Sequence, residues 1–170
     1  MKNRAIFLDR DGIINQNADI HEYITCWREF KFLPGVLNSL AELAKTNYKI
    51  IVITNQRGVA LGKINLSDLN QMHVNMVSQI KNKGGRIDKV YFCPHNFNEC
   101  NCRKPLPGML DLVANEFDID LNNSWVIGDS QNDIELGKSR GCKTIYIGKK
   151  NEYNADFYVK DLQEAIKKII

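Results

Sequence analysis

The stretch Ile6-Phe7-Leu8-Asp9-Arg10-Asp11-Gly12 decides how the rest of the chain is interpreted. The apolar run that begins at Ala5 and ends at Leu8 predicts a short buried strand. Two carboxylates follow at alternate positions. Alternate residues of an extended segment point the same way, so Asp9 and Asp11 can share one small space. They repel each other there unless a cation or a proton intervenes. Mg²⁺ suits this space because it is a hard cation that prefers oxygen ligands.

Two other interpretations of this stretch compete with a magnesium site. One is a polar loop after a strand, since Asp-x-Asp pairs are common in turns. The other is a calcium-binding loop, which needs an oxygen ligand at its fifth position, glycine at its sixth and glutamate at its twelfth. Those positions hold Ile13, Ile14 and Ile20 here. The calcium interpretation is therefore the weakest, and the other motifs must decide between a polar loop and a magnesium site.

The composition indicates one globular domain, covering residues 1–170. Hydrophobic residues make up 44% of the chain, enough for a full core, and the net charge is only +3. No arginine-rich run points to nucleic acid as the main partner. No signal peptide or membrane-spanning run is present in the sequence, so we expect a cytoplasmic protein. We also expect a monomer.

Strands and helices are expected to alternate along the chain. Further strands are predicted at 49–54, 89–93, 124–128 and 143–147, with a short extended piece at 157–159. Helices are predicted from Pro34-Gly35, from a Ser67 cap to about Asn82, and at 107–117, 132–139 and from Leu162. This alternation predicts an α/β fold, a doubly wound parallel sheet with helices on both faces. Residues 13–33 lack periodicity and are expected to form a long functional loop.

Polar residues follow four of the predicted strands. Asp9 and Asp11 follow the first, Thr54-Asn55 the second, Lys104 the third, and Asp129 the fourth, with Asp133 one helical turn later. Ligands of open α/β sheets bind outside the carboxyl ends of the strands. We therefore expect these groups to form one site.

This ordered set of four motifs resembles that of the haloacid dehalogenase superfamily of phosphotransferases. The resemblance covers nearly the whole chain and implies a phosphatase. It implies that Mg²⁺ binds Asp9, the backbone carbonyl of Asp11 and Asp129. Asp133 is then either a carboxylate at a helix start or, as we favour, a partner of the metal site that does not itself bind the ion.

The resemblance also implies a role for each catalytic group. Asp9 attacks phosphorus and forms an aspartyl-phosphate. Asp11 gives a proton to the leaving group and later takes one from water. Thr54 and Lys104 hold the phosphoryl oxygens on which charge develops.

A second metal site is predicted in the loop 93–102, which holds three of the five cysteines. Cys93, His95, Cys100 and Cys102 supply four nitrogen and sulfur ligands of the kind that bind Zn²⁺ in a tetrahedron. The alternative is three incidental cysteines and a loop histidine. With all four positions filled by protein, the zinc would be structural and would brace the loop that carries Arg103 and Lys104. Cys26 receives no role.

The cysteine loop, with Cys-Arg-Lys-Pro after it, resembles that of a subfamily with two activities. These are D-glycero-D-manno-heptose 1,7-bisphosphate 7-phosphatase and histidinol-phosphate phosphatase, both without a large cap domain. The stretches 9–15, 54–63 and 103–110 resemble the heptose enzymes more closely, although Ser130 stands where those often carry lysine. The resemblance therefore implies a sugar-phosphate substrate and a role in carbohydrate metabolism, as in lipopolysaccharide precursor synthesis. The expected substrate contacts are Asn17, Asn55, Gln56, Arg57 and Arg103, with Lys63 as a further cation.

A zinc-braced binding module without turnover is the third possibility. The intact pair Asp9 and Asp11 argues against it, because a protein that only binds does not need both carboxylates.

Overall fold

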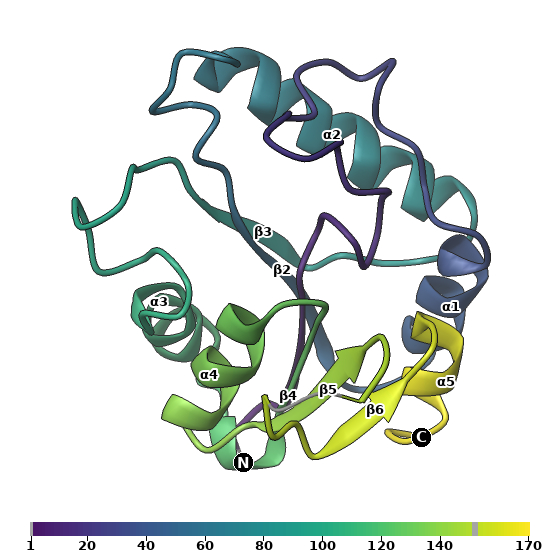
Figure 1. The fold of residues 1–170 in the computed structure, drawn as a ribbon. Coiled ribbons are helices and arrows are strands. Elements are labelled where there is room, and N and C mark those ends of the chain that lie inside the picture. The colour runs from purple at the N-terminus through teal and green to yellow at the C-terminus, as the bar shows by residue number, and fades with distance from the viewer. Residues whose placement is uncertain (1, 151–152) are drawn as a thin grey trace.

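The protein is described here by a computed structural model that covers residues 2–150 and 153–170. Its sheet has six parallel strands in the order β3-β2-β1-β4-β5-β6 (Figure 1). The strands are β1 (Ala5–Leu8), β2 (Lys49–Asn55), β3 (Lys89–Cys93), β4 (Trp125–Gly128), β5 (Lys143–Ile147) and β6 (Phe157–Val159). The predicted doubly wound α/β fold is confirmed.

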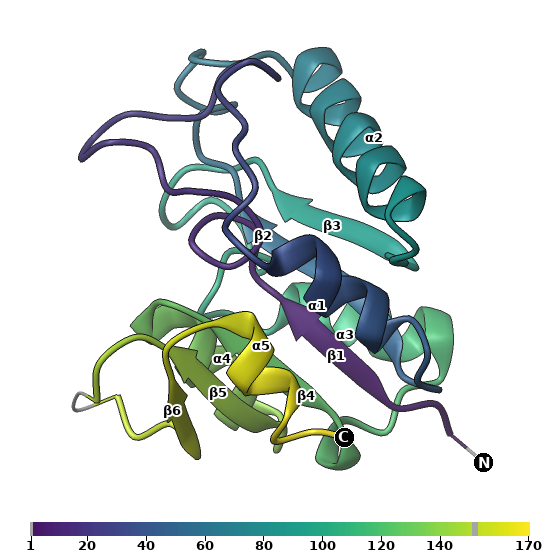
Figure 2. The ribbon, with the colours of Figure 1, turned by 90° about the vertical axis from the view of Figure 1, so that its right-hand side faces the viewer.

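Helices cover both faces of the sheet (Figure 2). On one face lie α1 (Val36–Leu43), α2 (Leu66–Asn82) and α5 (Leu162–Ile166), and on the other α3 (Gly108–Phe117) and α4 (Gln131–Ser139). The central strand β1 explains this arrangement. Ile6 and Leu8 join the first core cluster, whereas Ala5 and Phe7 join the second, and all four side chains are fully buried. A strand that is buried on both faces has an unbroken run of apolar residues in its sequence.

The order of the strands places the candidate site. From β1 the chain moves outward to β2 and β3, then crosses to β4 on the other side of β1 and continues to β5 and β6. The carboxyl ends of β1 and β4 therefore lie at the topological switch point, where this fold binds ligands. Asp9 follows β1 there, and Asp129 follows β4.

Most predicted elements agree with the structure to within one residue at each end. The predicted cap of α2 is wrong. Asn65, not Ser67, caps this helix, and its side chain accepts a hydrogen bond from the Asp68 backbone N–H. Both residue types suit a cap, and Leu66 between them is exposed, so no core contact fixes the start. A short 3₁₀ helix, Leu121–Asn123, was not predicted.

The loop at 13–33 contains no helix or strand, as predicted, apart from two isolated bridges that join Asn15 to Asp11 and to Phe32. Within the described residues no helix has the length and apolar character needed to cross a bilayer.

Candidate active site

Asp9 and Lys104 form the centre of the site. Lys104 is only 3% exposed, and its ammonium group has three acceptors, namely Asp133 Oδ1 at 2.6 Å, Asp9 Oδ1 at 2.9 Å and the Ile53 carbonyl oxygen at 3.1 Å. Burial opposes the charge on Lys104, but the two carboxylates outweigh it and raise its pKa. An ammonium has three N–H donors, so each donor of Lys104 has one acceptor here, and a bound phosphoryl oxygen would take the place of one of them.

The two oxygens of Asp9 have different surroundings. Oδ1 accepts from the backbone N–H of Arg10 at 2.7 Å as well as from Lys104. In the part of the chain that the structure describes, Oδ2 has no hydrogen-bond partner. Burial, with the nearby Asp133 carboxylate, raises the pKa of Asp9 to about 8. A nucleophile with one oxygen held and one open fits this arrangement.

Asp11 lies in a cradle of donors. Burial alone would raise its pKa, but the Arg10 guanidinium and the amides of Asn15 and Gln56 together hold that pKa below its usual value. The Arg10 Nη2 atom lies 2.9 Å from Oδ1 and 3.1 Å from Oδ2, and each amide donates at 2.8 Å. The cradle therefore favours the anionic carboxylate.

The second strand contributes side chains that orient their neighbours. The Asn55 amide makes two hydrogen bonds with the Lys104 backbone, at 3.0 and 3.1 Å, and so fixes the residue that reaches Asp9. Thr54 Oγ1 accepts from Gln56 Nε2 at 3.0 Å. The Thr54 hydroxyl proton consequently remains available for an oxygen of a bound ligand.

Asp129 accepts a hydrogen bond from the loop after β1 and lies very close to the backbone of that loop. Its Oδ2 atom accepts from Asn17 Nδ2 at 3.0 Å, and a Cβ added to Gly12 would lie only 1.9 Å from that same oxygen. Gly12 also has a φ of 80°, in the left-handed region. Only glycine lets the loop after β1 approach the end of β4 this closely.

The Asp133 carboxylate is held by neighbours at the start of α4. Its Oδ2 atom accepts from the Ser130 hydroxyl at 2.5 Å and from the Ser130 backbone N–H at 3.3 Å, while Oδ1 accepts from Lys104. Gly128 makes room for it, since a Cβ there would lie 2.3 Å from the Asp133 side chain. Asp133 thus ties α4 to Lys104.

The carboxylates at this point suit a hard cation. Asp9, Asp129 and Asp133 each place an oxygen within 4.8 Å of the others. Burial raises the pKa of Asp129 as well as that of Asp9, even though the Lys104 ammonium acts in the opposite direction on both, so a further proton or cation would relieve the remaining crowding of negative charge. Because Asp133 is already engaged by Lys104 and Ser130, the donor set fits Mg²⁺ held by Asp9 and Asp129.

The cysteine loop brings its four predicted ligands together. Sulfur and Nδ1 atoms of neighbouring ligands lie 3.4–3.6 Å apart. A zinc tetrahedron with its usual bond lengths separates ligand atoms by roughly 3.5–3.8 Å. All three cysteines are free thiols, and their sulfurs are much too far apart for a disulfide. The four side chains therefore fit a closed zinc site.

The tip of the cysteine loop contacts the segment after β2. Arg57 Nε donates to Asn96 Oδ1 at 2.7 Å, and the Arg57 guanidinium carbon lies 4.1 Å from the centre of the Phe97 ring. The Arg103 guanidinium carbon lies 4.5 Å from the same ring. These are cation–π distances, so Phe97 holds both guanidinium groups beside the site.

A cavity of about 360 Å³ joins these groups at the carboxyl edge of the sheet. Its lining contains most of the predicted site residues and two that were not predicted, Ser130 and Asn132: Asp9, Asp11, Asn17, Thr54, Asn55, Arg103, Lys104, Asp129, Ser130 and Asn132. Among the described residues, Gln56, Arg57 and Lys63 do not line it. Gln56 acts instead on Asp11, and Arg57 on the cysteine loop.

Sequence reasoning missed Arg10 and Asn15, which hold Asp11. Their positions within and just after the motif Asp9-Arg10-Asp11 were the available signal. It missed them because polar and charged residues beside a strand end are usually exposed, whereas both of these are buried.

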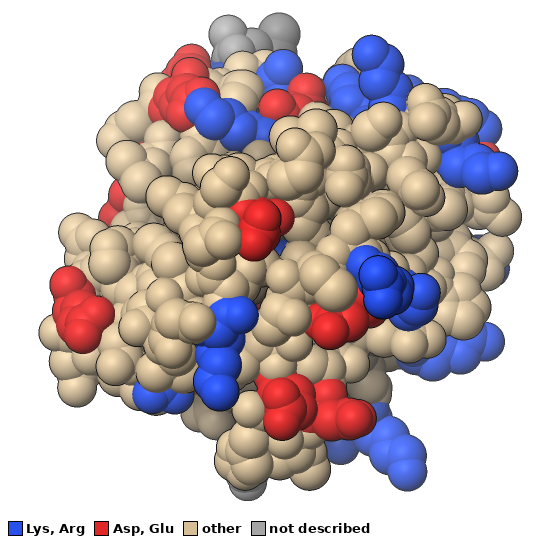
Figure 3. Space-filling view, turned by 90° about the horizontal axis from the view of Figure 1, so that it is seen from above, with Lys and Arg blue, Asp and Glu red and all other residues tan. Residues whose placement is uncertain are grey.

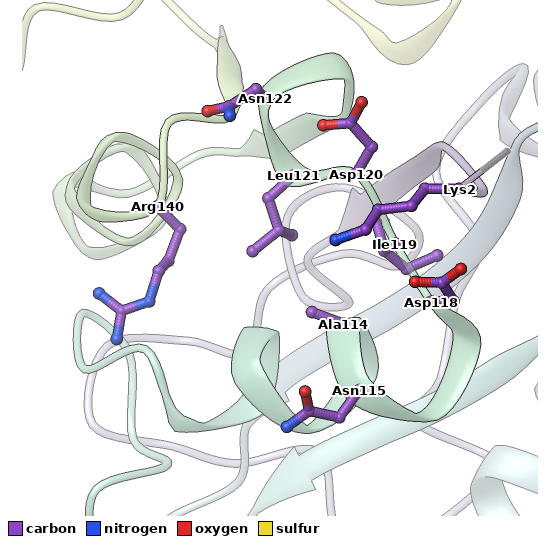
Figure 4. A pocket seen from close by; sticks show the side chains of 9 residues that line it. All are labelled: Lys2, Ala114, Asn115, Asp118, Ile119, Asp120, Leu121, Asn122 and Arg140. Carbon is purple, nitrogen blue, oxygen red and sulfur yellow. The ribbon is translucent and has the colours of Figure 1, made fainter.

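A second cavity, of about 430 Å³, lies at the amino-terminal end of the sheet (Figure 4). Lys2 and Arg140 stand on opposite sides of it. None of the predicted site residues lines it.

On the surface seen from above, positive and negative side chains are interspersed among uncharged ones (Figure 3).

Comparison with known proteins identifies the family. The family model described as polynucleotide kinase 3 phosphatase matches residues 4–169. The chain is a phosphatase of the haloacid dehalogenase superfamily. The phosphatase is 36% identical over 145 residues to D-glycero-beta-D-manno-heptose-1,7-bisphosphate 7-phosphatase of Pseudomonas putida, covering 85% of this chain and 82% of that one. It is 34% identical over 168 residues to the corresponding alpha-anomer enzyme of Campylobacter jejuni, covering 98% and 95%.

Solved structures agree with this assignment. The phosphatase superposes with a TM-score of 0.88 on D,D-heptose 1,7-bisphosphate phosphatase from Bordetella bronchiseptica, at 31% identity and with 98% and 97% of the two chains covered. That crystal structure is of a complex with magnesium and phosphate. Because this chain is an enzyme, the interpretation as a non-catalytic binding module is wrong.

Replacing Cys100 and Cys102 by serine tests the zinc assignment. Purified wild type should contain about one zinc per chain. The double variant should lose it and should melt on the order of 5–10 °C lower, because the metal links the loop ends in the folded state only. Plasma emission spectrometry and calorimetry measure both quantities. Cys26→Ser, at an exposed thiol outside the loop, is the matched control and should keep its zinc. Retention of zinc by the double variant would show that the site is misassigned.

Proposed function

We propose that this phosphatase removes the 7-phosphate of D-glycero-D-manno-heptose 1,7-bisphosphate by way of a phosphoryl group carried on Asp9. The observation that carries the mechanism is the arrangement of Asp9, whose Oδ1 is held by Lys104 while Oδ2 is open. The substrate is suggested by relatives of both anomeric specificities, from Pseudomonas putida and Campylobacter jejuni.

Each half of the reaction uses residues of this chain. Asp9 Oδ2 attacks phosphorus, the bond to the sugar oxygen breaks, and the sugar alkoxide takes a proton from Asp11. Water then attacks the phosphoryl group, its proton passes to Asp11, and Asp9 leaves as a carboxylate. The donors around Asp11 favour its anionic form, so the present geometry suits the second half. The first half requires Asp11 to be protonated, which the contact with Arg10 opposes.

Charge on the transferred phosphoryl group needs compensation. The Thr54 hydroxyl and the Lys104 ammonium are the cavity groups suited to its oxygens. Asp9, the backbone carbonyl of Asp11 and Asp129 would hold Mg²⁺, which when bound supplies charge neutralisation for a phosphate dianion. Asp133 keeps Lys104 in place. The position of these residues at one cavity supports the proposal.

Arg103 supports a substrate with a second phosphate. It lines the cavity, and its Nη1 atom is buried without a hydrogen-bond partner among the described residues. Guanidinium groups bind phosphate oxygens in pairs of hydrogen bonds, and a buried unpaired donor is costly. Arg57 remains a predicted contact, although it now faces Asn96 and Phe97. The cytoplasmic location and the monomeric state also remain predictions.

Steady-state kinetics on three substrates test this assignment. The value of kcat/KM should be at least about a hundredfold higher for heptose 1,7-bisphosphate than for histidinol phosphate. Arg103→Ala should lower it roughly tenfold to a hundredfold for the bisphosphate, as expected for a lost charge-assisted contact of about 1.5–3 kcal/mol. The same variant should act almost normally on heptose 7-phosphate, which lacks the second phosphate.

Two further variants complete the comparison. Arg140→Ala, which removes an arginine paired with Asp111 at the other end of the sheet, should leave both values unchanged. Arg57→Ala should lower the bisphosphate value if Arg57 turns to the substrate. A wild-type preference for histidinol phosphate would overturn the sugar assignment and leave the mechanism intact.

A further inference from the structure

Arg10 is an unusual arginine because it is almost completely buried, with 1% exposure. One side of its guanidinium group, Nε and Nη2, faces the Asp11 carboxylate. The other nitrogen, Nη1, lies 3.2 Å from His73 Nε2 and 3.6 Å from the sulfur of Met72. The guanidinium carbon lies over the Phe30 ring, 5.8 Å from its centre. Arg10 therefore links Asp11 to helix α2.

His73 must accept the hydrogen bond from Arg10. A guanidinium group can only donate, so Nε2 of His73 carries no proton and Nδ1 carries it. Burial, with the adjacent Arg10 charge, lowers the pKa of His73 to about 3, so the ring stays neutral. His73 is itself held in place, since its ring packs against Phe92 of β3 with the centres 5.4 Å apart.

The contacts of Arg10 with Met72 and His73 join the segment after β1 to α2. The described residues offer no other charged or imidazole partner to Nη1 of Arg10. Without His73, this donor would retain only the methionine sulfur, which is a weak acceptor. The guanidinium group could then turn, and the Asp11 carboxylate would keep only the amides of Asn15 and Gln56 as fixed donors.

We propose that His73 is a positioning residue for the hydrolysis of the phosphoenzyme. It fixes Arg10, and Arg10 fixes the Asp11 carboxylate in the cavity, where it takes the proton of the attacking water. The oxygen of that water bonds to phosphorus, the bond from phosphorus to the Asp9 oxygen breaks, and inorganic phosphate is released. This inference rests on the proposed function, because it requires a phosphoryl group on Asp9 and a base at Asp11.

The alternative is a buried histidine that only satisfies a buried arginine. Such a residue affects folding but has no reason to affect one step of the reaction more than another. The two roles therefore differ in the kinetic constant that changes. With p-nitrophenyl phosphate, kcat/KM reports transfer to Asp9 and needs no acid, because p-nitrophenolate is a good leaving group. Hydrolysis of the phosphoenzyme affects kcat alone.

The test compares His73→Leu, which has no acceptor, with His73→Gln, whose Oε1 can replace Nε2 as the acceptor for Arg10. For His73→Leu we expect kcat to fall at least about tenfold, since positioned proton transfer contributes about 10²–10⁴-fold. Its kcat/KM for p-nitrophenyl phosphate should stay within about twofold of wild type. Rapid mixing should show a larger burst of p-nitrophenolate, approaching one per active site. His73→Gln should recover most of the kcat.

Three outcomes would overturn the inference. These are an unchanged kcat in His73→Leu, an equal fall in kcat and kcat/KM, or equal values for the two variants. Asp11→Asn distinguishes failure of the His73 inference from failure of the proposed function. In that variant kcat should fall further than in His73→Leu, while kcat/KM for p-nitrophenyl phosphate is retained. If Asp11→Asn keeps full kcat, the assignment of Asp11 as the base is wrong. Melting temperatures of each variant confirm that folded protein is compared.

Discussion

Asp9→Asn should reduce turnover by more than about a hundredfold while leaving the fold intact, because losses at a covalent nucleophile span several decades. An amide oxygen is a poor nucleophile toward phosphorus. The substitution keeps the shape of the side chain, and the amide oxygen can still accept from Arg10 N–H and Lys104. Circular dichroism and phosphate release should be measured on the same preparation. Turnover above about a hundredth of wild type would contradict covalent catalysis at Asp9.

Asp118→Asn is a matched control for that substitution. Asp118 is exposed, lies beside the cavity at the other end of the sheet, and has a φ of 49°. Asparagine tolerates this left-handed conformation as well as aspartate does. The control should therefore retain full activity. That result would show that removing a carboxylate outside the site does not by itself lower turnover.

Lys104→Met should affect both activity and stability. Removing the ammonium should lower kcat/KM at least about a hundredfold, as for other groups that stabilise developing charge. It also leaves the buried Asp133 carboxylate without its cation, which should lower the free energy of unfolding by about 3–5 kcal/mol. Phosphate release and urea denaturation measure the two effects. The double variant Lys104→Met/Asp133→Asn should regain much of the stability but none of the activity.

The stability loss in Lys104→Met should depend on pH in a defined direction. In wild type without Mg²⁺, the pKa of Asp9 is raised to about 8 by burial and by Asp133, and Lys104 opposes this rise. Above about pH 8, Asp9 of folded wild type is ionised and paired with Lys104. Titration of Asp9 then no longer changes the free energy of unfolding of the wild-type protein. Without Lys104 the pKa of Asp9 in the folded variant is higher still. Folded Asp9 therefore keeps its proton above about pH 8, while unfolded Asp9 has lost it, so the free energy of unfolding of the variant continues to fall as the pH rises. The difference should therefore be larger at pH 9 than at pH 6.5, and a smaller difference at pH 9 would contradict the pairing.

The strands, the helices and the main site residues followed from local patterns in the sequence. β1 was predicted because a strand buried on both faces needs an unbroken apolar run, and Ala5 to Leu8 supplies it. Asp9, Lys104 and Asp129 were predicted because each follows a strand, and parallel strands place their carboxyl ends at one edge. The cluster of Cys93, His95, Cys100 and Cys102 was predicted because these residues lie within ten positions of one another.

Only the tertiary structure decided which partner each polar side chain of the site contacts. Arg10 turns into the core to meet His73, which lies 63 residues away, and no local pattern predicts a contact of that separation. Gln56 donates to Asp11 and Arg57 donates to Asn96, and neither contact was predicted, because each joins segments that are distant in the sequence. Sequence periodicity determines which face of a strand or helix is buried. The partner of a buried polar group depends instead on distances between distant segments, which exist only once the chain has folded.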